Sequence, residues 1–278
     1  MCPNSFGLSE YVPEPTKREV RRRCGFGCVV CGCAIVQYHH FDPPFAKAER
    51  HEPDGITLLC GQCHDRATRG ILADDLVRRA NASPWCLTHR YTRDILFVGP
   101  GRIPIRIGSS RFRAETIAMY DEDVVFGFRQ PECRDAPLRL NGVFTDPSGN
   151  ETLRIVDNEW RVGVERFDVR TKGRVLTIRN GPENQGIVFQ MNLEARSELH
   201  IRTLRMQYRG FDIDADDGGF RVGVAGRAPS LHLHGGVLAD IGIWMKSTGV
   251  SRSWSRSSIA EARAVLKTPM RRKGTPPR

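Results

Sequence analysis

The sequence predicts an α+β protein in which a small, metal-stapled N-terminal unit precedes a larger all-β domain. The first reason is length, because 278 residues exceed the usual size of one small domain. The second is the position of the cysteines, since seven of the nine lie between Cys24 and Cys86. The third is a change of pattern near Gly101, after which short alternating segments separated by turns dominate the chain.

The charge is unevenly distributed along the chain. The net charge of +10 and the pI near 9.4 favour a polyanionic partner. However, residues 252–278 contain eight basic residues and one acidic residue, so this tail carries +7 and leaves only +3 for the rest. We expect residues 249–278 to form a basic, disordered tail with nonspecific affinity for nucleic acid.

Membrane insertion and secretion are not expected. No apolar run approaches the roughly 20 residues that cross a bilayer, and the N-terminus lacks the pattern of a signal peptide. Clustered Cys-x-x-Cys spacing is typical of zinc in a reducing compartment, whereas disulfides spread through the fold that they staple. The sequence therefore predicts a cytoplasmic protein with no membrane partner.

A short basic helix is expected after an N-terminal extension of residues 1–15. Thr16 and Glu19 have the spacing of a capping box, and Gly25 is a plausible end of the helix. Arginines at positions 21–23 would form its exposed face, either as phosphate contacts or as a solvated surface.

The next elements follow the order strand, loop, strand, helix. Residues 35–41 and 55–59 are apolar enough for two strands, and residues 42–53 between them are rich in proline and charge. Residues 61–69 favour a helix that ends at Gly70.

A further helix is expected from Asp74, where two acidic residues precede a basic pair as the helix dipole prefers. This nuclease-like unit would occupy residues 16–82, with a linker at residues 83–100. In that linker Cys86 and His89 are interpreted as packing or surface residues, because neither has a partner at ligand spacing.

Residues 101–248 are predicted to form the β-rich domain, either a sandwich or a short β-solenoid. Trp160 is expected to fill its core, and the pair His232 and His234 is interpreted as a surface or core pair. The expected strands are residues 103–107, 153–156, 174–178, 187–191, 199–201 and 231–234.

Two Cys-x-x-Cys pairs predict a structural zinc site made of Cys28, Cys31, Cys60 and Cys63. The two-residue gap turns both sulfurs of a pair toward one ion. Cys24 and Cys33 are alternatives in the first pair, although their spacing is more typical of buried thiols.

Three histidines lie beside these cysteines: His39 and His40 before Pro43, and His64 directly after Cys63. In this order the motif resembles that of HNH endonucleases with a zinc-stapled ββα-metal finger, over about a quarter of the chain. The resemblance implies that His39 and His64 bind a catalytic divalent metal, Mg²⁺, Mn²⁺ or Ni²⁺, and that His40 is the general base that activates water.

The sequence departs from the family at one position. The family has an asparagine about five residues before the third cysteine, where this chain has Gly55. There are two alternatives: either His51 or Asp54 takes over the auxiliary role of the asparagine, or the activity is weak.

These observations predict a metal-dependent HNH endonuclease that cuts DNA, with a β domain for targeting, for a partner protein or for homo-oligomer assembly. By analogy of architecture it would act in phage defence or in a mobile element. The alternative is a non-catalytic zinc module that binds nucleic acid or protein. Three imidazoles beside the zinc distinguish the two hypotheses, because a binding module does not need them.

Overall fold

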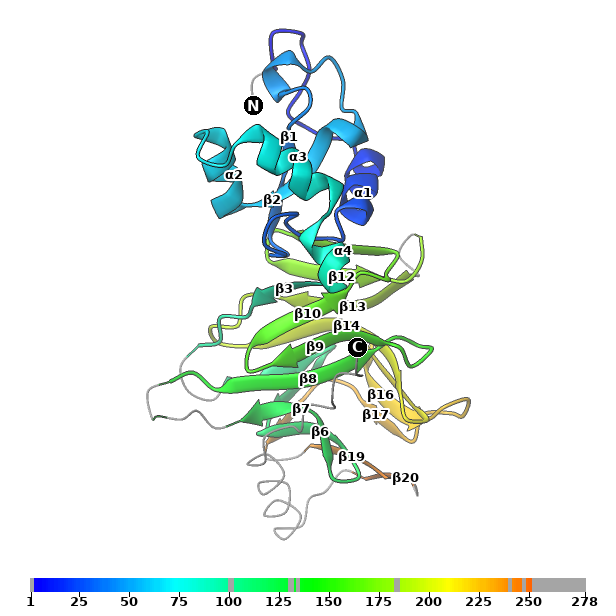
Figure 1. The fold of residues 1–278 in the computed structure, drawn as a ribbon. Helices are drawn as coiled ribbons and strands as arrows, with labels where there is room; N and C mark the ends of the chain where they lie inside the picture. Colours follow the sequence, from blue (N-terminus) through cyan, green and yellow to red (C-terminus); the bar gives the residue numbers. More distant parts are fainter. Residues whose placement is uncertain are drawn as a thin grey trace, which may run out of the picture.

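The computed structural model describes residues 3–99, 103–129, 133, 136–182, 186–239, 242–246 and 249–251, so the predicted basic tail beyond residue 251 lies outside the described residues. A small unit that contains the four α-helices of the described residues sits on a larger part built from strands (Figure 1). An α+β fold that is largely β is therefore confirmed. In the described residues, no helix combines the length and apolar character needed to span a membrane.

Helix α1 runs from Glu14 to Arg23 and begins earlier than the capping box predicts. Pro13 occupies the N-cap position and Pro15 lies in the first turn, so Thr16 is inside the helix and caps nothing. Proline suits a first turn because its backbone torsion is already helical and its missing N–H has no partner to lose there.

The expected strand, loop, strand, helix order is confirmed. Strands β1 (Val36–His40) and β2 (Ile56–Cys60) pair antiparallel, with Val36 opposite Cys60 and His40 opposite Ile56. The intervening loop contains two short 3₁₀ turns, η1 (Phe45–Lys47) and η2 (Pro53–Gly55). Helices α2 (Gly61–Thr68) and α3 (Asp74–Ala82) follow the hairpin.

The segment expected to be a linker at residues 83–100 contains secondary structure within its described residues, 83–99. It contains helix α4 (Trp85–His89) and strand β3 (Tyr91–Ile95), and β3 pairs with β10 (Glu159–Gly163) as an edge strand of a large sheet. Its strand was not predicted because the partner strand of β3 lies far along the sequence, where local patterns give no information about pairing.

Most strands belong to two sheets, of eight and ten strands. The eight-stranded sheet has the order β20 (Gly249–Ser251), β19 (Ile243–Lys246), β6 (Thr116–Tyr120), β7 (Asp123–Arg129), β8 (Arg139–Thr145), β9 (Glu151–Val156), β10 and β3. The main path of the ten-stranded sheet is β11 (Asp168–Lys172), β12 (Val175–Arg179), β13 (Ile187–Asn192), β14 (Leu199–Tyr208), β15 (Phe211–Asp216), β16 (Gly219–Val224) and β17 (Leu231–Leu233). Strands β4 (Ile105–Ile107), β5 (Ser110–Arg113) and β18 (Val237–Ala239) join it through β14.

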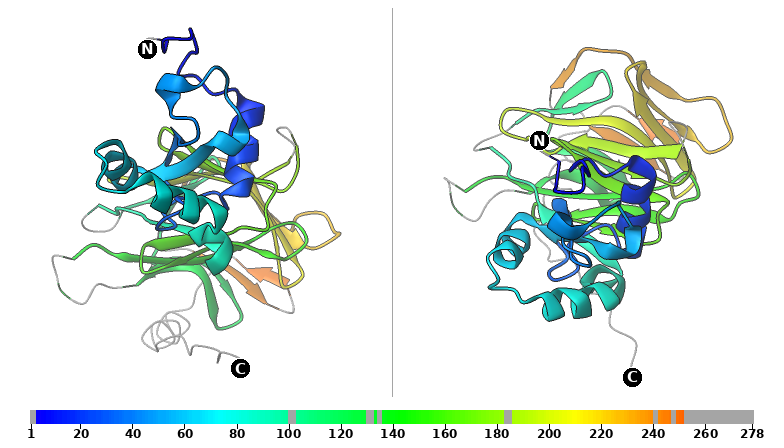
Figure 2. Two further views of the ribbon diagram at one scale, coloured as in Figure 1. Left: turned by 45° about the horizontal axis from the view of Figure 1, so that its top comes forward. Right: turned by 90° about the horizontal axis from the view of Figure 1, so that it is seen from above.

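Of the two predicted architectures, the structure has the sandwich. Sheet neighbours are mostly antiparallel and consecutive in sequence, as in meanders, whereas a solenoid stacks parallel strands. The inner faces share one core: the ring of Phe144 on β8 lies 4.9 Å from that of Phe189 on β13, and Trp160 is fully buried as predicted. Figure 2 shows the two layers with the helical unit at one end.

The N-terminal unit is joined to the sandwich by backbone hydrogen bonds and shared core residues. The Arg93 N–H of β3 donates to the Gly32 carbonyl at 3.0 Å, and the Ala34 N–H donates to the Arg93 carbonyl at 2.9 Å. Phe26 and Ala34 also belong to the sandwich core rather than to the core of their own unit. The loop between the first two cysteines and β1 therefore extends the edge of the eight-stranded sheet.

The expectation of three exposed arginines in α1 is wrong for Arg21. Its side chain is 4% exposed and is bound by the buried Asp168 of β11. Arg23 is half-buried and donates to backbone carbonyls of its own unit, so of the three only Arg22 is exposed.

Candidate metal centre and histidine cluster

The four predicted zinc ligands converge. The sulfur atoms of Cys28, Cys31, Cys60 and Cys63 all lie within 4.8 Å of one another, and those of Cys31 and Cys60 are 3.6 Å apart. Tetrahedral zinc with Zn–S bonds near 2.3 Å needs sulfurs about 3.8 Å apart. In the part of the chain that the structure describes, this quartet is the one converging group of three or more candidate ligands, and it can bind a metal such as zinc.

Local backbone geometry forms each pair. In the first, the Cys28 N–H donates to the Cys33 carbonyl at 2.8 Å, and the Gly32 N–H donates to the Cys28 carbonyl at 2.9 Å. Gly32 adopts a φ of +78°, and a Cβ there would lie 2.1 Å from the Trp85 ring, so only glycine fits. In the second pair Cys60 caps α2, where its sulfur accepts from the Cys63 N–H at 3.5 Å.

A cation would change the protonation of this quartet. Burial and the neighbouring sulfurs of Cys60 and Cys31 raise the pKa of the Cys63 thiol to about 12. A bound dication reverses that preference, because thiolate is the form that binds metal.

Cys24 and Cys33 lie outside the quartet. Burial raises the pKa of the Cys24 thiol, whose sulfur is 3.7 Å from the Thr57 hydroxyl. The Cys33 thiol donates to Asp94 Oδ2 at 3.1 Å, and burial followed by the Asp94 carboxylate raises its pKa. Cys28 and Cys31, rather than these alternatives, are the cysteines that converge with the second pair.

His39 and His64 lie side by side. His39 is on β1 opposite Thr57, His64 is in the first turn of α2, and their ring centroids are 5.1 Å apart at 90°. Burial and the charge of a protonated His64 lower the pKa of His39, while Asp74 opposes this effect. Neutral imidazoles are the form that ligates metals, and this spacing allows a nitrogen of each ring to reach one ion.

His40 has a different set of neighbours. Its Nε2 lies 3.1 Å from Nδ1 of His51, and the Phe45 ring packs 5.3 Å from its own ring. Burial, followed by positive charge on His51 and His39, lowers the pKa of His40 to about 4. The imidazole is therefore neutral at pH 7 and able to accept a proton.

The backbone does not bend between His39 and His40. Their cross-strand partners, Thr57 and Ile56, are consecutive, so the two side chains point to opposite faces of the hairpin. His39 faces α2, whereas His40 faces the loop between the strands.

The structure explains why no asparagine stands at position 55. A Cβ at Gly55 would lie 2.1 Å from the carbonyl oxygen of Asp42, so a side chain there would displace the loop. Of the two auxiliary candidates, His51 is the one hydrogen-bonded to His40, whereas the described contacts place Asp54 in turn η2 without a bond to the histidines.

Sequence reasoning missed one acidic neighbour of this cluster. Asp74, at the start of α3, is close enough for its charge to act on His39. The signal that pointed to Asp74 was its place at a helix N-terminus, which does not reveal that the helix packs near β1.

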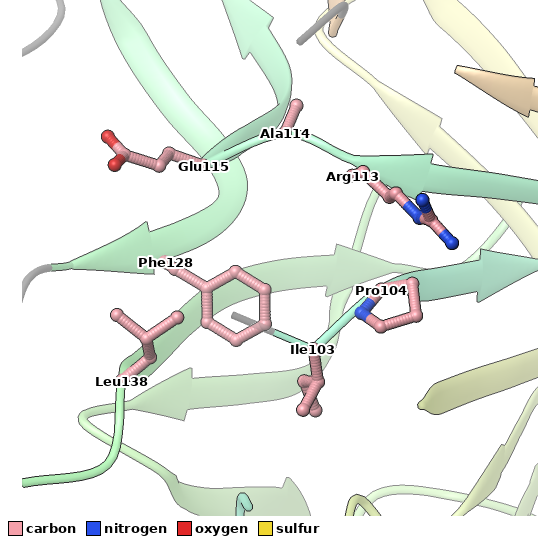
Figure 3. A pocket seen from close by; sticks show the side chains of 7 residues that line it. All are labelled: Ile103, Pro104, Arg113, Ala114, Glu115, Phe128 and Leu138. Atoms are coloured by element: carbon pink, nitrogen blue, oxygen red, sulfur yellow. The ribbon is translucent and has the colours of Figure 1, made fainter. Parts of the chain in front are cut away.

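Other candidate groups stand apart from the cluster. His232 and His234 are both exposed, consistent with a surface pair, and His89 stacks on Trp85 with its ring centroid 3.8 Å away. A pocket of about 330 Å³ in the sandwich has an apolar floor of Ile103, Phe128 and Leu138 (Figure 3). The residues that line it in the described chain include neither histidine nor cysteine, so it adds nothing to the metal chemistry.

Comparisons with protein-family models, with curated proteins and with solved structures found no match.

Proposed function

We propose that the N-terminal unit is an HNH-type ββα-metal finger and that the protein hydrolyses phosphodiester bonds in DNA. The observation that carries the proposal is the placement of His39 and His64 beside each other, on β1 and α2, next to a four-cysteine cluster. A cysteine cluster alone is common to zinc modules of many kinds. A pair of imidazoles that can ligate a metal and a separate imidazole that can accept a proton, all at the same hairpin, are what metal-assisted hydrolysis requires.

His39 and His64 would hold one divalent cation, which when bound supplies positive charge to the phosphate and to the leaving 3′ oxygen. His40 lies on the face of the hairpin opposite His39, so it would accept a proton from water that attacks from that side, and burial keeps its imidazole neutral at pH 7. His51 fixes the orientation of the His40 ring through the 3.1 Å contact between their nitrogens. The other ring nitrogen of His40 then remains for the water.

The cysteine cluster would have a structural role in this proposal. It joins the loop before β1 to the start of α2, and His39 lies on β1 while His64 lies on α2. Zinc bound there would hold the two imidazoles at a fixed separation. The β sandwich would then serve targeting or assembly in a cytoplasmic nuclease that acts in phage defence or in a mobile element.

A plasmid-nicking assay tests the proposal directly. We expect supercoiled plasmid to be converted to open-circular or linear DNA when Mn²⁺, Ni²⁺ or Mg²⁺ is added, and we expect His40→Ala to lower the rate about 10²–10⁴-fold. His232→Ala is the matched control, because it removes an exposed histidine on the sandwich. Cleavage that persists undiminished in His40→Ala would refute the assignment. A zinc-loaded, folded protein that never cuts would favour the non-catalytic module.

A further inference from the structure

Positive charge is concentrated where α1 meets the sandwich. Two grooves, of about 800 and 200 Å³, flank α1 at this seam. Eight basic and three acidic residues line them, a net charge of +5. Residues 1–251 together carry only +3, so the remainder of that region is net negative. Two of the lining arginines, Arg21 and Arg166, are neutralised by Asp168 and Asp146 behind the grooves.

The larger groove, called here the basic groove, lies between α1 and the connection from β10 to β11. Its charged lining residues are Arg18, Glu19, Arg22, Arg23, Glu165 and Arg166. In Figure 1 this seam lies at the level where α1 approaches the strands of the sandwich. An open groove of this volume suits an extended chain better than an enclosed small molecule.

Arg18 and Arg22 of the basic groove have no close carboxylate partner of their own, although a neighbouring aromatic ring restrains both side chains. Arg22 is exposed and makes no ion pair in the described chain. Arg18 reaches only Asp168, at 4.0 Å, and Asp168 is already bound by Arg21. Both guanidinium groups lie over the Phe167 ring, at 5.5 and 5.9 Å, which limits their side-chain freedom before any ligand arrives.

The acidic lining does little to cancel this charge. Glu165 is engaged by Arg90, which lies outside the groove. Glu19 is exposed on α1, where water screens its field. Arg166 is paired with Asp146 at 3.2 Å, so the positive charge that the groove leaves without a close counterion is that of Arg18 and Arg22.

Arg23 connects the basic groove with the histidine cluster. Its Nη2 donates to the carbonyl of Pro53 at 2.8 Å and to the carbonyl of Ile56. Ile56 is the cross-strand partner of His40. One residue that lines the groove is therefore bonded to the backbone of the strand that pairs with the strand of the general base.

We propose that the basic groove binds the backbone phosphates of duplex DNA and positions that duplex for the histidine cluster. The positioning of the duplex for the histidine cluster rests on the proposed nuclease function, whereas the binding of phosphates does not. Guanidinium groups that line an open groove can pair with successive phosphates of a sugar-phosphate backbone, which supplies affinity without reading sequence. Arg18 and Arg22 would make the phosphate contacts, with Phe167 keeping their planes in place.

Fluorescence anisotropy with a short labelled duplex tests this surface. All proteins carry His40→Ala, so that the DNA is not cut, and all keep the full chain, so that the basic tail contributes equally. Arg18→Gln/Arg22→Gln removes two groove charges, while Arg202→Gln/Arg227→Gln removes two exposed charges elsewhere on the sandwich. Affinity is measured at several salt concentrations without added divalent metal.

We expect the groove variant to bind more weakly and the slope of log K against log salt to flatten by about 1.8, since each lost phosphate contact contributes about 0.9. The sandwich variant should keep the parent slope. A groove variant whose affinity and slope equal those of the sandwich variant would overturn the proposal. Arg22→Glu, a single reversal at an exposed position, repeats the test in a protein whose folding is not in question.

The two proposals can fail separately. Groove-dependent binding by a protein that never cuts DNA in the nicking assay would leave the surface standing and remove the nuclease function. Metal-dependent cutting by a protein whose binding is indifferent to Arg18 and Arg22 would do the reverse.

Discussion

Arg21 of α1 and Asp168 of β11 form a buried bidentate ion pair across the junction of the two parts. Arg21 Nε donates to Oδ1 at 2.8 Å and Nη2 donates to Oδ2 at 2.7 Å, and each side chain is 4% exposed. Arg21 also donates to the Tyr38 hydroxyl at 2.8 Å, so the pair is linked to β1. Asp168 thereby fixes the strand that carries His39 and His40.

Removing the carboxylate should destabilise the protein strongly. Asp168→Ala leaves a buried guanidinium without its main partner, and breaking a buried pair in this way costs about 3–5 kcal/mol. Thermal unfolding of the variant should show this loss. The matched control is Glu194→Ala, which breaks the exposed pair with Arg174 and should change stability by less than about 1 kcal/mol. Equal melting of the two variants would contradict the role of Asp168.

Metal content should depend on the cysteine quartet. We expect about one zinc per chain by elemental analysis, and we expect Cys60→Ser to lower both zinc content and melting temperature, because metal binding and folding are coupled in so small a unit. Cys133→Ser is the control, since Cys133 is exposed and outside the quartet. Folded protein without zinc, or an unchanged Cys60→Ser variant, would argue against a structural metal.

His51 should act through His40. His51→Ala removes the 3.1 Å contact with His40 Nε2, and a hydrogen bond worth about 1 kcal/mol corresponds to roughly a fivefold loss in kcat. KM should stay the same, because His51 is not expected to touch DNA. His51→Asn should recover part of the rate. A rise in KM with kcat unchanged would show that His51 serves binding instead.

The metal preference should follow from nitrogen ligands. His39 and His64 favour later transition metals over Mg²⁺, which prefers oxygen. Nicking rates with Mn²⁺, Ni²⁺ or Co²⁺ should therefore equal or exceed those with Mg²⁺. A strict Mg²⁺ requirement would place a carboxylate in the metal site, and Asp74 is the first candidate because its charge already acts on His39.

Acid should weaken the sandwich at Asp146. Burial alone would raise the pKa of this carboxyl, but hydrogen bonds from Asn150 and Ser148 and the charge of Arg166 outweigh it and lower the pKa below the usual value. The stabilisation is therefore present above the unfolded pKa of about 3.9 and is lost as pH falls through the lower folded value.

The variant Asp146→Asn has no carboxyl to titrate at this position, so it should lack this part of the pH dependence of stability. It should lose about 1–3 kcal/mol at pH 7, because several donors lose a charged acceptor. Its stability should also change less than that of the parent protein between pH 5 and pH 3, as measured by urea unfolding. Parallel pH profiles for the two proteins would exclude Asp146 as the cause.

The sequence was informative where structure is local. Helix α2 ends before Gly70, and α3 begins at Asp74, as caps and dipole-matched charges predict. The cysteine quartet followed from spacing for the same reason. Contacts across long sequence separations were not accessible: Arg21 was expected on the surface because its partner lies 147 residues away.

The same limit applied to the site and the sheets. The contact of His51 with His40 was one of two alternatives, and only the folded loop distinguishes it from Asp54. The sheet position of β3 depends on β10, more than sixty residues later, so periodicity could predict strands but not their order.

The hydrogen bonds between Arg93 and the Gly32–Ala34 segment indicate that the N-terminal unit does not fold independently of the sandwich. A fragment ending at residue 82 would expose Phe26 and Ala34, which the sandwich core now covers. A fragment beginning at residue 101 would lack β3 and leave β10 as an open edge, which is a template for aggregation. Gene fusions that exchange one part for a foreign domain should therefore fail to give soluble, folded protein.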